Sequence, residues 1–262
     1  MGTLELFGRS VLFGLILLIA AGQLAAQGLR HPVLKSQVKQ LQREEAASLL
    51  SEFCGKEVVT IGGIGLECPV KAFGPAFSGI IDRMFHPEGA LFGHFLDVGS
   101  DDVAVSGWSA ETHPDLWGGT LLLTKRNGKW IPVWYTSALI TRDCEKVTLP
   151  SRREILLCEI EDGGMGHQLH YLYSVDLKTP VDLDASVMFV TNSFHDGCNA
   201  QQQIIDAVRW ISDRRSLSVV IRTSEFQNSA SRGCAGNPKR ERPPATILLQ
   251  FAVTDSGFQK NP

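Results

Sequence analysis

The run GGTLLLTKRNGKWIPVWY, residues 118–135, carries the clearest signal of local structure in the chain. Asn127 and Gly128 stand between two apolar segments, and both residues tolerate the positive φ of a type I′ turn. The run therefore predicts a β-hairpin that pairs residues 121–125 with residues 129–134. Pro132 has no amide proton, so its strand should lie at a sheet edge or be interrupted at this residue.

Apolar and polar residues also alternate in HQLHYLYSVDL, residues 167–177, which predicts a strand with one solvated face. Further strands are expected at residues 103–106, 154–160, 187–191, 217–222 and 247–253. Residues 204–211 fit either a strand or a helix, because Ile204, Val208 and Ile211 also share one helical face. No regular βαβ alternation appears, so the sequence predicts an all-β, mainly antiparallel fold.

The N-terminal 54 residues differ from this pattern. Residues 1–26 combine Arg9, an apolar core and small residues before Gln27, which is typical of a cleaved signal peptide. Their apolar run, residues 11–21, is about half of the roughly 20 residues that span a bilayer, so we expect an exported, periplasmic or extracellular protein without stable membrane insertion. An uncleaved anchor is the alternative. The spacing of apolar residues then predicts one amphipathic helix in a segment over 27–54, ahead of a β-rich domain over 55–262.

Six cysteines follow the expected signal peptide, and export places them where disulfides persist. Pairing of sequence neighbours gives the expected bridges Cys54–Cys68, Cys144–Cys158 and Cys198–Cys234. The segments CGKEVVTIGGIGLEC and CEKVTLPSRREILLC have the same length and terminal cysteines, which suggests two hairpins that are each closed by a disulfide. The chain has no C-x-x-C pair of the kind that zinc knuckles and thioredoxin-like sites use.

Charge and motifs exclude several functions. A net charge of −3 gives no electrostatic basis for nucleic-acid binding. The sequence lacks a G-x-S-x-G elbow, a P-loop and an H-E-x-x-H helix, so it favours binding over catalysis. The alternative is a periplasmic hydrolase that uses acids of the 97–102 loop with a nearby histidine, His94 or His113. A structural envelope protein is a further alternative.

The segment from Phe95 to Val105, FLDVGSDDVAV, resembles the FG-GAP type of β-propeller blade, in which an Asp/Gly-rich loop leads into an Asp-Asp-apolar strand. LPSRREILLCEIEDGG, residues 149–164, followed by LHYLYSVDL, residues 169–177, is similar to other bacterial propeller blades. The resemblance implies a partial or irregular β-propeller that is used for binding, often with Ca²⁺ in the loops. The candidate calcium ligands in this chain are Asp97, Asp101 and Asp102.

Two readings of these aspartates stay open at this point: a Ca²⁺ loop, or a turn in which their side chains accept backbone hydrogen bonds. The segment WSAETHPDLWGG, residues 108–119, offers a candidate binding surface formed by Trp108, His113 and Trp117. The same tryptophans could instead close the core. Taken together, these features predict an exported binding protein for a protein or carbohydrate ligand.

Overall fold

The computed structural model describes residues 33–54, 59–61, 65–69, 84–109, 118–137, 139–164, 167–179, 181, 183–195, 199–211, 214–227, 239–240 and 243–262. The expected signal peptide, His113, Trp117, Cys198 and Cys234 lie outside these residues. No helix within the described ranges combines the length and apolar character that crossing a membrane requires.

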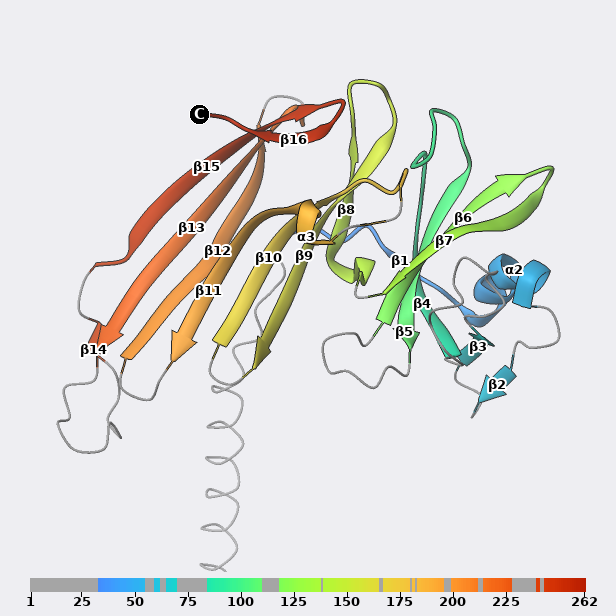
Figure 1. Cartoon of the computed structure of the whole chain (residues 1–262), viewed down its shortest axis with the longest axis horizontal. Coiled ribbons are helices and arrows are strands. Elements are labelled where there is room, and N and C mark those ends of the chain that lie inside the picture. Colours follow the sequence, from blue (N-terminus) through green and yellow to red (C-terminus); the bar gives the residue numbers. More distant parts are fainter. Residues whose placement is uncertain are drawn as a thin grey trace, which may run out of the picture. The chain divides into compact units, whose positions relative to one another are not determined.

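The first sheet is an antiparallel meander whose strands pair in chain order (Figure 1). The strands are β2 (Val59–Ile61), β3 (Gly65–Pro69), β4 (Met84–Gly93), β5 (Asp102–Ser109), β6 (Gly118–Arg126) and β7 (Lys129–Ser137). A short strand, β1 (Lys39–Gln40), pairs with β4. This sheet and the next confirm the predicted all-β class, and neither closes on itself within the described residues.

The predicted hairpin is the β6–β7 pair. Asn127 and Gly128 have φ of 53° and 79°, as a type I′ turn requires, and Arg126 pairs with Lys129 across it. The register shifts where Leu123 faces Pro132, and β7 ends the strand order of its sheet. Both expectations for Pro132, an edge position and an interruption, are therefore confirmed.

The second sheet is also a meander in chain order. The strands are β8 (Cys144–Thr148), β9 (Glu154–Gly164), β10 (His167–Val175), β11 (Val187–His195), β12 (Asn199–Ile211), β13 (Ser216–Gln227), β15 (Ala245–Thr254) and β16 (Gly257–Lys260). β14 (Lys239–Arg240) pairs with β13, and a 3-10 turn, η4 (Thr141–Asp143), and a short helix, α3 (Leu183–Ser186), lie in the connections.

The ambiguous segment 204–211 belongs to strand β12. A register shift lies between Ile205 and Ala207, so one extra residue interrupts the pairing with β13. This bulge changes the phase of the strand, and Ile205, Val208 and Trp210 all pack into the same core. Ile204 and Ile211, which share the helical spacing with Val208, are not part of this core, and Ile211 is 39% exposed.

Strand β9 separates two hydrophobic cores. Leu156 and Cys158 belong to a core shared with the first sheet, whereas Ile155 and Leu157 belong to a core within the second sheet. All four side chains are buried. The continuous apolar run of this strand therefore reflects burial on both faces of the sheet.

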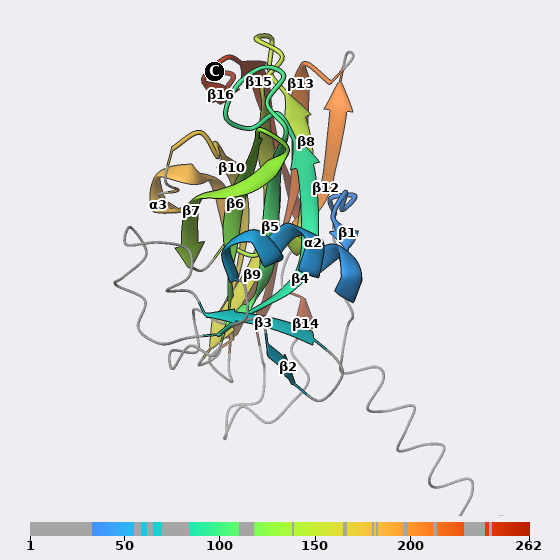
Figure 2. The ribbon, with the colours of Figure 1, turned by 90° about the vertical axis from the view of Figure 1, so that its right-hand side faces the viewer.

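The N-terminal helix is shorter than predicted. Helix α2 covers only Arg43–Cys54 (Figure 2). Its Leu49 and Leu50 side chains pack into the core shared by the sheets. Residues 33–42, which we call the strap, are extended instead. Tertiary hydrogen bonds replace the helical ones, because the amide of Gln37 donates to the Cys144 carbonyl (3.0 Å) and that of Leu41 to the Glu88 carbonyl (2.9 Å).

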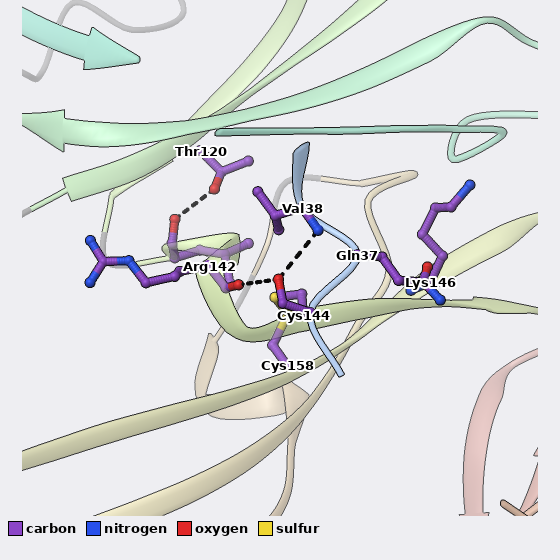
Figure 3. The surroundings of a disulfide bond; sticks show 9 residues. Gln37, Val38, Thr120, Arg142, Cys144, Lys146 and Cys158 are labelled. Carbon is purple, nitrogen blue, oxygen red and sulfur yellow. Dashed lines mark hydrogen bonds between the residues drawn. A yellow bond between two sulfur atoms is a disulfide. The ribbon is translucent and has the colours of Figure 1, made fainter. Parts of the chain in front are cut away.

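The strap lies beside the predicted disulfide between Cys144 and Cys158 (Figure 3). The two cysteines are directly opposite one another on β8 and β9, and both are buried. Cys144–Cys158 is therefore confirmed, as is the hairpin that it closes. Cys54 is also disulfide-bonded, but the side chain of its expected partner, Cys68, is outside the described residues.

Removal of this bridge should destabilise the protein. We expect the double variant Cys144→Ala with Cys158→Ala to lose about 3 kcal/mol of unfolding free energy, because the cross-link no longer restricts a loop of 14 residues in the unfolded chain. Urea denaturation of the purified variant measures the change. An unaltered midpoint and slope would contradict the stabilising role.

Asp143, next to this bridge, gives the stability a pH dependence. Burial raises the pKa of Asp143 above its ordinary value of 3.8; the negative charge of Glu159 adds to this effect, Arg142 opposes it and Glu161 reinforces it. Because the folded protein binds this proton more tightly than the unfolded chain does, protonated Asp143 adds to the unfolding free energy. The contribution is fully present below about pH 3.8 and is lost as the pH rises through the pKa of Asp143 in the folded protein.

We therefore expect Asp143→Asn to be more stable than the parent protein at pH 7, with the difference shrinking toward pH 4. Thermal melts across this pH range make the comparison. A difference that does not vary with pH would show that ionisation of Asp143 is not its cause.

Candidate functional site

A cleft of about 390 Å³ opens between the tip of the β6–β7 hairpin, the loop after β4 and the start of β9. We call it the aromatic cleft. Its walls include Phe92, His94, Asp101, Lys125, Trp130 and Glu154. The volume lies within the range of small-ligand sites in proteins.

Two aromatic rings form one corner of the aromatic cleft. Phe92 of β4 and Trp130 of β7 have ring centroids 6.3 Å apart and meet edge to face at 62°. Lys125 pairs directly with Trp130 in the hairpin, and its Nζ lies 5.6 Å from the centre of the indole. Phe92 is 43% exposed and Trp130 is partly buried, so the corner offers apolar surface next to solvent.

Asp102 organises the loop that follows β4. Its Oδ2 accepts hydrogen bonds from the amides of Phe95 and Leu96, both at 2.8 Å, and from the hydroxyl of Ser100 at 2.5 Å. The residue is 1% exposed, and its Oδ1 has no hydrogen-bond partner in the described part of the chain. The carboxylate thus acts as the acceptor of a turn ahead of β5.

The other two candidate calcium ligands do not join Asp102 in a cluster. The Asp97 side chain is 79% exposed and lies 3.5 Å from Lys178 Nζ, whereas the carbonyl of Asp101 accepts the Lys125 amide at 2.8 Å. Among the residues that the structure describes, no group of three His, Cys, Asp or Glu side chains is arranged to hold a metal ion. Calcium binding by this loop stays a prediction.

His94 and Glu154 connect the two sheets at the base of the aromatic cleft. The His94 amide donates to Glu154 Oε2 (2.8 Å), and the Glu154 amide donates to the His94 carbonyl (2.9 Å). Nδ1 of His94 donates to the Ser100 carbonyl at 2.5 Å, because a carbonyl oxygen only accepts. Glu154 also forms an ion pair with Lys146 at 3.2 Å.

The binding surface predicted from the sequence is only partly described. Trp108 is 41% exposed at the end of β5, and its ring centroid lies 5.2 Å from that of His86. It does not line the aromatic cleft, where Phe92 and Trp130 stand instead. Trp130 could have been singled out from the sequence, because it follows the Asn127–Gly128 turn closely and sits at a hairpin tip.

The substitution Asp102→Ala tests whether this carboxylate stabilises the loop that follows β4. We expect a loss of about 2–4 kcal/mol of unfolding free energy, because the substitution leaves two amide donors near the core without their acceptor. Asp101→Ala is the matched control: its side chain is exposed, and the change should stay within about 0.5 kcal/mol. Equal losses in urea denaturation would refute the role assigned to Asp102.

Comparison with known protein families, with curated protein sequences and with solved structures finds no match for this chain. The resemblance to FG-GAP-like blades therefore stays a prediction.

Proposed function

We propose that this protein is an exported binding protein that holds a carbohydrate ligand in the aromatic cleft. The observation that carries the proposal is the half-exposed corner of Phe92 and Trp130, which polar side chains surround. A pyranose ring packs its C–H face on an aromatic ring while its hydroxyl groups bond to carboxylates, lysines and imidazole. Sites of this composition are typical of small-ligand recognition.

The charges that line the aromatic cleft favour a ligand that is uncharged in the part that enters this cleft. Lys146 is paired with Glu154, so these two charges offset one another. Lys125 lies over the Trp130 ring, and the neighbouring Asp101 adds an exposed carboxylate to the same cleft. Neither sign of charge dominates, and hydrogen bonds rather than ion pairs would select the ligand.

The carboxylates of Asp102 and Glu154 already have hydrogen-bond or ion-pair partners within the protein, and this favours binding over catalysis. Asp102 directs one carboxylate oxygen to three donors, and Glu154 accepts the His94 amide and pairs with Lys146. These contacts give both carboxylates a structural role, because they hold the loop after β4 and join it to β9. The alternative hydrolase keeps one supporting observation, because His94 and Asp101 do line the same cleft.

The proposed location and architecture have separate support. The Cys144–Cys158 disulfide is consistent with export to an oxidising compartment. Strands β4–β7 form a four-stranded antiparallel meander of the size of a propeller blade, and their core includes side chains of β9 and β10. On this basis we infer that the sheets are the blade-like units of an irregular propeller.

Trp130→Ala should weaken the binding of neutral oligosaccharides about 10- to 100-fold, because the variant loses the ring on which a sugar packs. Trp108→Ala is the matched control, with an exposed tryptophan outside the aromatic cleft, and should bind as the parent protein does. Calorimetric titration with hexasaccharides of glucose, xylose and mannose measures both.

Other results would point elsewhere. If Trp108→Ala lost the binding and Trp130→Ala kept it, the surface around residues 108–119 would replace the aromatic cleft as the site. Release of shorter sugars from the hexasaccharides, abolished in His94→Gln, would favour the hydrolase. Failure of all three hexasaccharides and of the acidic ones described below would refute carbohydrate binding.

A further inference from the structure

A second cavity, of about 790 Å³, lies on the other side of the Lys146–Glu154 ion pair. Both of these residues line the aromatic cleft as well, so the two cavities meet at this pair. The strap contributes Gln37 to the second cavity, and the turn before β13 contributes Arg214 and Arg215. We call it the basic pocket.

The basic pocket has an excess of positive charge. Of its four charged side chains, Lys146 and Glu154 offset one another at 3.2 Å, and Arg214 is paired with the buried Glu145, so the uncompensated positive charge is that of Arg215. Arg215 is exposed, and its guanidinium forms no hydrogen bond or ion pair with any other described residue. An arginine with free donors in a cavity wall is suited to a carboxylate, which it binds through two parallel hydrogen bonds.

Arg214 is held in place beside it. Its guanidinium stacks 4.7 Å from the centre of the Trp210 ring and lies 3.4 Å from Glu145 Oε2. The Glu145 carboxylate is buried and accepts the Trp210 indole N–H at 2.6 Å. Arg214 has a φ of 64°, a left-handed conformation, in the turn before β13.

We propose that the basic pocket binds the carboxylate of an acidic sugar whose neutral neighbours occupy the aromatic cleft. The ligand class is therefore a uronate-containing oligosaccharide. This inference rests on the proposed carbohydrate binding for the sugar and on Arg215 for the charge. Lys146 and Glu154, where the cavities meet, are positioned to contact the linkage between the two portions of the ligand.

The test compares charged and neutral forms of one ligand on the intact protein. Hexasaccharides of glucose, xylose and mannose that each carry one glucuronate residue are titrated calorimetrically beside their methyl esters, which have the same sugar rings without the charge. The charged form of at least one hexamer should bind about tenfold or more tightly than its ester. Arg215→Ala should reduce this preference to nearly nothing, and raised salt should weaken it.

Arg209→Ala is the matched control, because Arg209 is an exposed arginine on β12 outside both cavities. It should keep the preference for the charged form. Trp130→Ala should weaken the binding of the charged hexamers and of their esters to the same extent. This pattern supports the inference and the proposed function together.

The remaining outcomes separate the two. If esters and acids bind equally and Trp130→Ala weakens both, carbohydrate binding stands and the anion pocket is refuted. If acid binding depends on Arg215 but not on Trp130, the anion pocket stands and the aromatic cleft is refuted as the sugar site. Tighter binding of inorganic phosphate than of monomeric glucuronate would show that the basic pocket binds a free oxyanion. It would overturn the inference that the bound anion is the carboxylate of a sugar. Absence of binding by every hexamer would overturn the inference.

Discussion

The reciprocal hydrogen bonds between His94 and Glu154 are the contact on which the candidate site depends. They join the loop after β4 to the start of β9, and thus the first sheet to the second. A Cβ atom on Gly93 would lie 2.5 Å from Glu154 Oε2, so a larger residue at this position would displace the carboxylate that His94 contacts. The same carboxylate pairs with Lys146, and this ion pair separates the aromatic cleft from the basic pocket.

Local signals in the sequence were sufficient for much of the fold. The Asn127–Gly128 turn specifies its own hairpin through the positive φ of both residues, and the hairpin places Lys125 opposite Trp130. The Cys144–Cys158 bridge follows in the same way, because a short hairpin brings its two ends together. In each case the residues that decide the structure are close neighbours in the chain.

Long-range contacts explain what the sequence could not predict. The bulge between Ile205 and Ala207 is defined only by pairing with β13, so the segment alone fits two periodicities. Residues 33–42 have apolar residues at helical spacing, yet four of their amides bond to groups on β4, β8 and β9 instead. The aromatic cleft also combines Phe92 with Glu154, two residues far apart in the chain whose meeting no local pattern encodes.

The strap shows how such contacts determine the site. Oε2 of the buried Glu159 accepts the amides of Val33 (2.7 Å) and Leu34 (3.0 Å), and its Oε1 lies 2.6 Å from Nε2 of His170. A buried carboxylate is costly to desolvate, and these partners offset that cost. With this end anchored on β9, the strap places Gln37 in the wall of the basic pocket and then pairs with β4 through β1. A segment that forms no helix and only the two-residue strand β1 therefore both ties the sheets together and shapes the pocket in which we place the ligand's charge.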